Sequence, residues 1–438
     1  MARKFANLPL RVYLNSRLVG TLELLNMARM RFQYAVEWLE WVHCFPVSLS
    51  LPLTPESMSS PEVFAVFENL LPDDPGTRQR IARSVSALSD HPYHLLQEIG
   101  RDCVGALQFM SGEDHPGPPG AVNGELITDE QIAEKIRNLY TDPLGLSEDG
   151  EFRISIAGAQ AKSALLNWDE KWHIPKSSTA TTHILKPAIG KLPDGLDLSD
   201  SVENEHLCMT LVGELGIEAA ETKIQNFVDQ HVLVVKRFDR HWTSDHRLLR
   251  LAQEDCCQAL GVPSLRKYQS NGGPSIVQIM ELLKSADKPM EERRLFLKSQ
   301  VVLWLLAAID GHGKNFSIFL TPGGGFALTP LYDVMSVQSY LNAREIPRNQ
   351  TKMAMSIGTS NHYRLHTIRP YHFKQTAAET GFPKRMFQEI LEELVESCPL
   401  AIETVGASLP SGFPQNLFAA ITDGIKTRLK LCEKEAID

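Results

Sequence analysis

The stretch that decides the fold is SQVVLWLLAAIDGHGKNFSIFLTPGGGFALTPLYDV, residues 299–334. It continues a strongly helical pattern over residues 275–309, and the wholly apolar run Val301–Ile309 predicts that this helix is buried. A polar turn follows at residues 310–315. Two short apolar runs then flank the glycines of TPGGG, a pattern that predicts strand, turn and strand. The polar turn therefore lies between a buried helix and a hairpin.

The turn contains Asp310 and Asn315, with four residues between them. This spacing is typical of a kinase catalytic loop, where the aspartate accepts or orients the proton of the attacking hydroxyl and the asparagine holds a metal ion. A second carboxylate, Asp333, follows the hairpin, as a two-metal phosphoryl-transfer site requires. A purely structural interpretation stays open, because Gly311 and Gly313 suit a polar turn and an aspartate after a strand is common.

Three elements upstream extend this pattern. The alternating strand THILKP presents Lys186, which suits nucleotide phosphates, although solvated lysines are common at strand ends. The predicted helix at 202–214 carries Glu203 and Glu205, and Glu205 is a candidate partner for Lys186. The small residues of Arg153–Lys162, between the predicted strands RISIAG and ALLNW, either let backbone N–H groups approach phosphates or make a plain hairpin turn. The order of these elements is that of a kinase and favours a phosphotransferase.

The remaining segments predict an α+β fold. Residues 8–53 favour short strands, with a hairpin in PLRVYLNSRLVGTLEL, and residues 61–100 favour helices, the last closed by Gly100. A Gly- and Pro-rich loop at 111–125 precedes a helix at about 128–140. We place the domain boundary after residue 145, so that an N-terminal subdomain, 1–145, precedes a domain at 146–438 that is mostly helical from about 371.

Composition limits the classes of protein. Hydrophobic residues make up 43% of the 438 residues and charged residues 22%, which is a globular balance. The formal net charge of −9 argues against a protein whose whole surface binds DNA or an anionic membrane. The apolar run at 301–309 is far shorter than the roughly 20 residues of a membrane helix. Seven cysteines without a CxxC pair fit reduced thiols in the cytosol better than disulfides or a zinc site.

Across nearly its whole length the chain resembles the HipA-type serine/threonine-protein kinase toxins of bacterial type II toxin–antitoxin systems. The resemblance rests on many segments in the same order. They are SLSLPL, FENLLPD, LLQEIGRDCVGAL, FRISIAGAQAKSALL, TTHILKP, VENEHL, RFDR, QEDCCQALG, GGPSI, DGHGKNFS and LTPLYDV. Together these segments are highly specific for the family.

The resemblance implies a distant, phosphoinositide-kinase-like protein-kinase fold with two lobes, and a cytoplasmic enzyme that uses ATP and Mg²⁺. It implies that Asp310 is the catalytic residue and that Asn315 and Asp333 bind the metal. It also implies that Ser155 is autophosphorylated, and that this phosphate expels the loop covering the nucleotide and switches the kinase off. The nucleotide-binding residues that it implies are Ala157, Gly158, Ala159, Gln160, Ala161, Lys162, Lys186, Lys236, Arg237, Phe238, His312, Gly313, Lys314, Asn315, Tyr332 and Asp333.

The resemblance also implies partners. They are a small dimeric helix-turn-helix antitoxin, operator DNA bound mainly through that antitoxin, and a protein substrate such as an aminoacyl-tRNA synthetase, of which glutamyl-tRNA synthetase is the family example. No membrane partner is expected. Two alternatives remain at this point. One is a catalytically silent corepressor, against which the intact Lys186, Asp310, Asn315 and Asp333 argue. The other is a small-molecule kinase, whose His-Gly-Asp order differs from the order here, where His312 follows Asp310.

Overall fold

The structure is a computed structural model that describes residues 8–146, 154–158 and 160–437. Its internal contacts divide the chain into two compact units. The first unit comprises residues 1–187, 225–265 and 318–326, and the second comprises residues 188–224, 266–317 and 327–438. The boundary predicted after residue 145 lies inside the first unit and stays a prediction.

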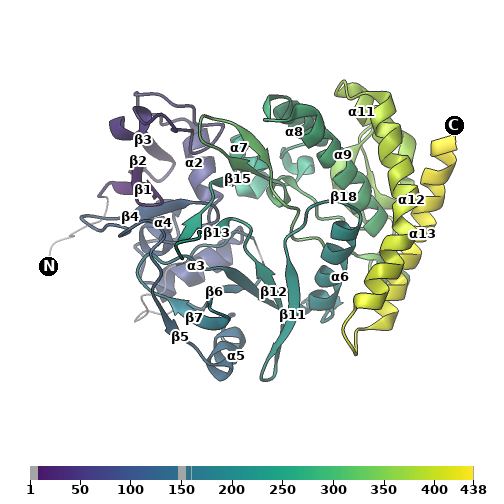
Figure 1. Cartoon of the computed structure of the whole chain (residues 1–438), viewed down its shortest axis with the longest axis horizontal. Coiled ribbons are helices and arrows are strands. Elements are labelled where there is room, and N and C mark those ends of the chain that lie inside the picture. Colours follow the sequence, from purple (N-terminus) through teal and green to yellow (C-terminus); the bar gives the residue numbers. More distant parts are fainter. Residues whose placement is uncertain (1–7, 147–153, 159, 438) are drawn as a thin grey trace. The chain divides into compact units, whose positions relative to one another are not determined.

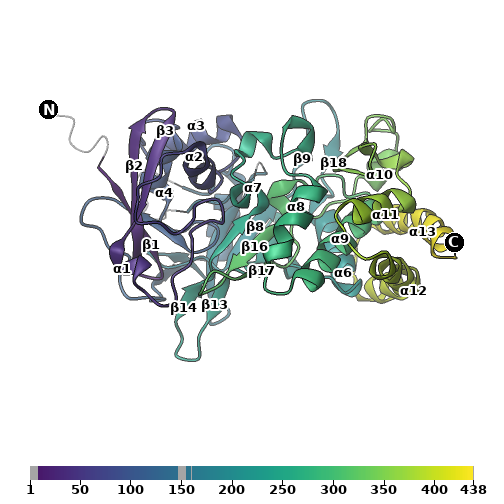
Figure 2. The ribbon, with the colours of Figure 1, turned by 90° about the horizontal axis from the view of Figure 1, so that it is seen from above.

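The N-terminal part of the first unit is a four-stranded antiparallel sheet with the order β3-β2-β1-β4. Figure 2 labels three of its strands, β1, β2 and β3. The predicted hairpin is present, and its turn residues Asn15 and Ser16 both have positive φ, as a tight two-residue turn requires. The last helix of this part ends at Gly100, whose N–H bonds to the carbonyl of Leu96, as predicted. The elements are β1 (Leu10–Leu14), β2 (Arg17–Asn26), β3 (Arg29–Tyr34), α1 (Val36–Leu39), α2 (Pro61–Glu68), α3 (Pro75–Ser84), α4 (Pro92–Ile99) and β4 (Leu107–Met110).

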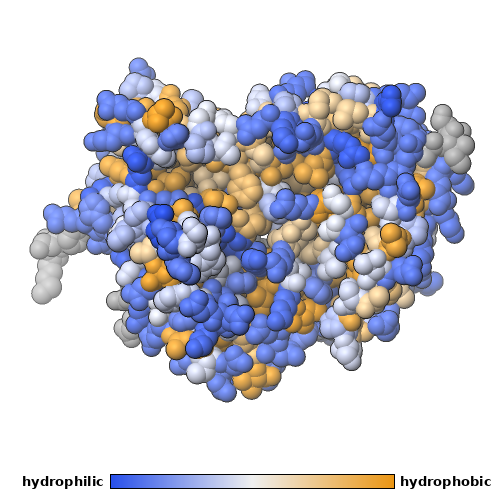
Figure 3. All heavy atoms as spheres, viewed as in Figure 1, coloured by the Kyte–Doolittle hydropathy of each residue, from blue (hydrophilic) through white to orange (hydrophobic). Residues whose placement is uncertain are grey.

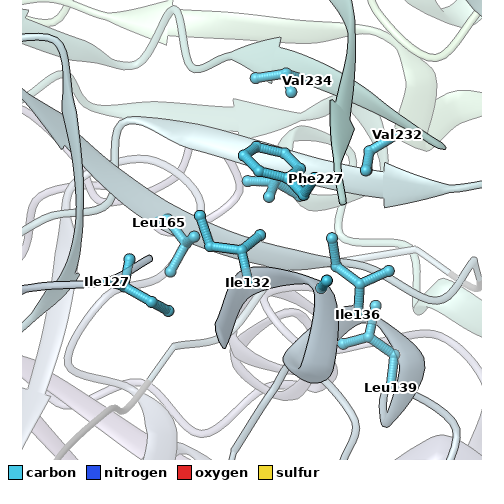
Figure 4. Packing of buried hydrophobic residues seen from close by; sticks show 10 residues of the cluster. Ile127, Ile132, Ile136, Leu139, Leu165, Phe227, Val232 and Val234 are labelled. Carbon is cyan, nitrogen blue, oxygen red and sulfur yellow. The ribbon is translucent and has the colours of Figure 1, made fainter. Parts of the chain in front are cut away.

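The rest of the first unit is built on a six-stranded sheet with the order β11-β12-β8-β6-β7-β5. The helix α5 (Asp129–Arg137) begins with a capping box at Thr128 and covers one face of this sheet. Its Ile132 and Ile136 share a buried cluster with Leu165 and Phe227 of the sheet (Figure 4). The strands are β5 (Gly124–Leu126), β6 (Ser163–Trp168), β7 (Lys171–Pro175), β8 (His183–Pro187), β11 (Thr222–Phe227) and β12 (Gln230–Lys236).

Shorter elements follow β12 along the chain. The hairpin of β13 (Arg240–Trp242) and β14 (Leu248–Arg250) precedes β15 (Gln253–Asp255) and α7 (Cys256–Ala259). A three-stranded sheet has the order β15-β16-β17. Its strands β16 (Ser317–Leu320) and β17 (Phe326–Leu328) are the predicted strand–turn–strand, and Gly323 and Gly324 in the turn both have a φ of 88°.

The second unit is mainly helical, and α9 (Pro289–Leu306) forms its core, with every residue from Phe296 to Leu306 buried. The two long C-terminal helices, α12 (Lys384–Ser408) and α13 (Gln415–Ile437), run side by side (Figure 1). The other helices are α6 (Ser201–Glu214), α8 (Ile276–Leu282), α10 (Gln338–Asn342) and α11 (Pro370–Glu379). Two small antiparallel pairs are β9 (Gly190–Lys191) with β10 (Asp197–Leu198), and β18 (Lys352–Ile357) with β19 (His362–Arg364).

Two predicted elements are wrong. The helix expected over 275–309 is broken, because the chain leaves α8 through a short 3-10 turn and restarts α9 at Pro289, a residue that suits the first turn of a helix. The strand expected in RISIAG does not form over its described residues, 154–158. There the N–H of Ser155 donates to the carbonyl of Asp102 rather than to a ladder partner.

Hydrophilic side chains cover most of the face shown in Figure 3, and apolar residues are scattered between them. Of the helices within the described ranges, none combines the length and the apolar character that a bilayer span needs.

Candidate active site

In the second unit, Asp310 lies just beyond the end of α9. The helix ends where Ala307 takes a left-handed conformation, with a φ of 54°, and this residue turns the chain out of the core. The side chain of Asp310 is 60% exposed, and the hydroxyl of Tyr268 donates a hydrogen bond of 2.7 Å to its Oδ1. Asp310 is therefore accessible to a substrate and at the same time fixed in its orientation.

Asn315 belongs to a short 3-10 turn, Gly313–Asn315, that follows Asp310. Its side chain is buried, and its Nδ2 donates a hydrogen bond of 2.9 Å to the main-chain carbonyl of Asp310. This bond uses the nitrogen of the amide and leaves its oxygen as the group suited to a metal ion. The four-residue spacing thus folds into direct contact between the two residues.

Asp333 lies in a segment that is fixed on both sides. Before it, Leu331 forms a parallel bridge with Ala219. After it, the N–H of Ser336 donates to Oδ1 of Asn204, and Nδ2 of Asn204 donates to the carbonyl of Ser336, each over 2.8 Å. Asp333 itself is exposed and has a φ of 59°, a left-handed conformation that aspartate tolerates better than most residues.

Asp310, Asn315 and Asp333 line one small pocket of the second unit, together with Gly311 and Tyr332. The three side chains that the sequence singled out therefore meet, although 23 residues of sequence separate the first from the last. Within the described ranges no group of three or more His, Cys, Asp or Glu side chains forms a metal cluster. The two oxygen donors Asn315 and Asp333 fit a cation that takes its other ligands from phosphate and water.

The remaining predicted residues of this half surround the same turn. The ring of Tyr268 packs edge-on against His312, with centroids 5.0 Å apart. The hydroxyl of Tyr332 donates to the carbonyl of Lys314 over 2.7 Å and lies 2.6 Å from the hydroxyl of Ser317. Gly313 donates its N–H to the carbonyl of Lys267. The turn is therefore held by hydrogen bonds on several sides.

The first unit holds the other half of the predicted residues. Lys186 is buried on β8, an interior strand between β12 and β6. Its neighbour Leu185 belongs to the cluster under α5. Because successive side chains on a strand alternate between faces, Lys186 lies on the face of the sheet away from α5. Since Glu205 belongs to the second unit, its pairing with Lys186 stays a prediction.

The loop before β6 is fixed by its own side chains. Nζ of Lys162 donates to the carbonyl of Ala157 over 2.7 Å, and Nε2 of Gln160 donates to the carbonyl of Pro187 at the end of β8 over 3.2 Å. The loop residues that the structure describes are Ala157, Gly158, Gln160, Ala161 and Lys162, and Ala159 lies outside the described residues. The loop is thus attached to the strand that carries Lys186.

Ser155 is completely buried just before this loop. Its hydroxyl donates a hydrogen bond of 2.7 Å to the carbonyl of Leu70, and its N–H donates to the carbonyl of Asp102 over 2.9 Å. In this conformation the hydroxyl is not accessible to a phosphate donor, so modification of Ser155 requires the segment to leave its place.

The segment after β12 has a different character from the one predicted. Lys236 is exposed at the end of the strand, and the ring of Phe238 packs edge-on against Phe319 at 5.9 Å. Arg237, in contrast, is buried, and its guanidinium donates to both carboxylate oxygens of Asp239 at 2.8 and 2.9 Å. The side chain of Arg237 is therefore occupied within the fold.

Arg237 belongs to a buried ion cluster with Asp102, Asp239, Arg240 and Arg250. Although burial acts to raise it, the pKa of the Asp102 carboxyl is held well below its ordinary value by the three arginines. Burial, followed by the repulsion from Arg237, lowers the pKa of Arg240 to about 10. The cluster has a formal charge of +1, and each carboxylate in it forms ion pairs with more than one arginine.

Two residues that support the site were not singled out from the sequence. Tyr268, which contacts Asp310, lies in an irregular segment with no periodic pattern, and nothing in the sequence indicated it. Asn204 lies between Glu203 and Glu205 on a helix that the sequence predicted correctly. A polar residue on the buried face of that helix was the available signal.

A buried strand lysine in the first unit and a converging Asp, Asn and Asp set in the second unit are residue types that are typical of a kinase. The comparisons give the family. A model described as the HipA-like C-terminal domain matches residues 154–402, and one described as the HipA N-terminal domain matches residues 10–110. The chain therefore belongs to the HipA family of serine/threonine-protein kinase toxins, as the sequence predicted.

Individual relatives agree. A putative kinase of Sinorhizobium fredii, Y4mE, is 32% identical over 400 residues, which are 90% of this chain and 91% of the relative. The serine/threonine-protein kinase toxin HipA of Shewanella oneidensis is 27% identical over 420 residues, 92% of this chain and 90% of the toxin. The solved complex of Shewanella oneidensis HipA with HipB and operator DNA contains a chain that matches with a TM-score of 0.78, 26% identity and 97% coverage of both chains. The α+β kinase-like fold is thus confirmed.

Proposed function

We propose that this protein transfers the γ-phosphate of ATP to a serine or threonine of a protein involved in translation, and to its own Ser155. The observation that carries the proposal is the convergence of Asp310, Asn315 and Asp333 on one pocket. A phosphoryl-transfer site requires a group that orients the attacking hydroxyl and oxygen ligands for the metal, and these three side chains provide both.

Each residue has a role in this proposal. Asp310 accepts or orients the proton of the attacking hydroxyl, and its hydrogen bond from Tyr268 holds the receiving carboxylate in place. Asn315 and Asp333 hold Mg²⁺, which when bound neutralises phosphate oxygens and so makes the γ-phosphorus accessible to a nucleophile. The amide nitrogen of Asn315 bonds to the carbonyl of Asp310, an arrangement that keeps its oxygen available for the metal.

Nucleotide binding is assigned to both units. Lys186 contacts phosphates and the loop Ala157–Lys162 covers them, while Lys236, Arg237 and Phe238 face the adenine. Because the guanidinium of Arg237 is occupied by Asp239, its contribution falls to the main chain. In the second unit, nucleotide binding is assigned to His312, Gly313, Lys314, Asn315, Tyr332 and Asp333. The attachment of Gln160 to the strand of Lys186 supports a common role for the loop and the lysine.

Phosphorylation of Ser155 is the proposed switch. The hydroxyl is buried against Leu70 and bonded to its carbonyl, so a phosphate with about two negative charges does not fit in its place. The modified segment must therefore leave, and it takes with it the loop that begins two residues later. This physical argument supports an enzyme that inactivates itself when the phosphate is added.

The partners are assigned by kinship. The related toxin was solved in a complex with HipB and operator DNA, and the match covers 97% of this chain and 97% of the toxin chain. We therefore assign to this protein a small dimeric helix-turn-helix antitoxin, with operator DNA bound mainly through it, and an aminoacyl-tRNA synthetase as substrate. None of the seven cysteines, all of which lie among the described residues, forms a disulfide, and six of them are buried, which supports a cytoplasmic location.

The test measures intact mass before and after incubation with Mg²⁺ and ATP. The wild-type protein is expected to gain phosphate, and Asp310→Asn is expected to gain none. Asp287→Asn is the matched control, because Asp287 is an exposed acidic residue just before α9 and the charge change is the same. Ser155→Ala is expected to lose autophosphorylation but to keep phosphotransfer to a protein substrate.

Two results would contradict the proposal. One is a wild-type protein that gains no phosphate while Asp310→Asn stays as toxic in cells as the wild type. That outcome would favour a catalytically silent corepressor. The other is transfer to small molecules but not to proteins, which would favour a small-molecule kinase.

A further inference from the structure

The second unit contains a larger cavity away from the pocket of Asp310. Its volume is about 430 Å³, within the range of sites that hold small organic ligands. It is lined by residues from the end of α9, the short helix α10, the segment around 365–369 and the helix α13. Every residue that lines it belongs to the second unit.

The lining combines an apolar floor with cationic groups. Trp304, Leu341, Leu365, Ile368 and Leu431 supply the apolar part. The charged groups that line it are Arg348, Arg369, Arg428 and Asp423, with His366 beside them. Asp423 is exposed and lies 3.6 Å from Lys426, so the cavity itself carries an excess of positive charge.

Arg428 on α13 is the decisive residue. Its Nε donates to the carbonyl of Leu305 in the last turn of α9 over 3.0 Å. Its Nη2 is buried and has no hydrogen-bond acceptor among the described residues, and none of their carboxylates pairs with it. Burial lowers the pKa of this guanidinium to about 10. A largely buried guanidinium whose charge no carboxylate offsets is costly, and a fold that keeps one at the wall of a cavity gains when an anion enters.

Two further polar atoms beside the cavity also lack partners within the described part of the chain. They are Oε1 of Gln338 and Nδ1 of His366, and both are buried. Gln338 lies close to the backbone of α13, because a Cβ on Gly424 would be only 2.6 Å from its Oε1. Both residues line the cavity, and each has one polar side-chain atom without a hydrogen bond.

We propose that this cavity binds a small organic phosphate, with the phosphate held by Arg428, Arg348 and Arg369 and a planar or apolar body resting against the floor around Trp304 and Leu431. Guanidinium groups match phosphate geometry, and several of them around one dianion are typical of phosphate sites. The site is separate from phosphotransfer and does not rest on the function proposed above.

The test uses phenyl phosphate as the probe, because it joins a phosphate to one planar ring. Isothermal titration calorimetry on the full-length protein is expected to show that phenyl phosphate binds. Inorganic phosphate, benzoate and phenol are each expected to bind at least tenfold more weakly than phenyl phosphate. Arg428→Gln is expected to weaken phenyl phosphate binding at least tenfold. Arg348→Gln, at an exposed position, is expected to weaken it at least fivefold. Arg385→Gln is the control, because Arg385 is an exposed arginine of α12.

Each outcome of this experiment supports or overturns the proposed phosphate site. If Arg428→Gln fails to fold, Arg348→Gln still tests the site, because Arg348 is exposed and its loss leaves the core intact. Binding that is equal in wild type, Arg348→Gln and Arg385→Gln would place the probe elsewhere and overturn the proposal. Absence of binding to the wild type at millimolar phenyl phosphate would also overturn it, and stronger binding of benzoate would exclude phosphate as the ligand group.

Discussion

Replacing Asp102 by asparagine tests the buried ion cluster most directly. Oδ1 of Asp102 lies 2.9 Å from Arg240 and 3.0 Å from Arg250, and Oδ2 lies 3.4 Å from Arg237. The same Oδ2 accepts hydrogen bonds from the N–H and the hydroxyl of Thr181, at 3.0 and 2.7 Å. The substitution Asp102→Asn keeps the size of the side chain, removes its charge and exchanges one acceptor for a donor.

The magnitude follows from the charges that are left behind. In the wild type, three arginines face two carboxylates, whereas in the variant they face Asp239 alone and the formal charge rises from +1 to +2. The side chains of all three arginines are 2–4% exposed, so water cannot compensate for the loss. Removing one partner of a buried ion pair costs about 3–5 kcal/mol. We expect a loss of this size, expressed as a lower urea midpoint of unfolding.

The assay is urea unfolding at pH 7, followed by circular dichroism. The control is Asp245→Asn, because the pair of Asp245 with Arg247 is also short, at 2.8 Å, but is exposed on both sides. Its midpoint is expected to stay close to that of the wild type. If the two variants lose the same amount, the buried cluster does not stabilise the fold and the reasoning fails.

The dependence on pH gives a second check. Because the folded-state pKa of Asp102 is well below its ordinary value of about 3.9, its contribution is fully present above that value. It is lost only as the pH falls further, toward the folded-state pKa. The difference between wild type and Asp102→Asn should therefore be constant from pH 7 to about pH 4 and shrink below it.

Three further predictions concern other buried groups. Burial raises the pKa of Glu254 to about 8, so the wild type should lose stability from about pH 4.5 to pH 8, and Glu254→Gln should melt increasingly higher than the wild type over this range. Asn204→Ala removes both hydrogen bonds to Ser336, which hold the segment after Asp333. Steady-state kinetics should show kcat lowered about tenfold or more with little change in KM for ATP. An unchanged kcat would mean that the position of Asp333 does not depend on these two hydrogen bonds. A thiol reagent should label Cys44 quickly in the native protein and all seven cysteines after unfolding, and fast labelling of a second thiol would contradict the buried positions of the other six.

Patterns in the local sequence predicted most elements of the fold. The Asn15-Ser16 turn, the cap at Gly100 and the glycines at 323–325 are local signals, and each stands where it was expected. Of the two wrong elements, the helix over 275–309 is broken by a local feature, the restart at Pro289, whereas the expected strand RISIAG has its partners far along the chain. RISIAG alternates like a strand, but the N–H of Ser155 bonds to Asp102 and its hydroxyl to Leu70, about 50 and 85 residues away in sequence. No local pattern indicates such a partner.

The candidate site shows the same division. The motif from Asp310 to Asn315 could be predicted from the sequence, because phosphoryl transfer needs both residue types in one turn. Tyr268 could not be predicted, because its hydroxyl contacts a carboxylate 42 residues further along the chain and no sequence pattern indicates such a contact. The resemblance implies that Arg237 binds the nucleotide, and no local pattern indicates that Asp239, two residues on, occupies its guanidinium.

The segment RFDR has a consequence for the domain boundary. Asp102 lies within the part that matches the HipA N-terminal domain, whereas Arg237 and Arg240 lie within the part that matches the C-terminal domain, and all three belong to one compact unit. A fragment that begins at residue 146 would retain three arginines of the cluster with Asp239 alone, the same imbalance as in Asp102→Asn. The strand that ends at Lys236 would then lose the carboxylate that neutralises the residues following it. The N-terminal region is therefore part of the structure that holds the strand of Lys186 and its neighbour β12, and the kinase half is expected to need it in order to fold.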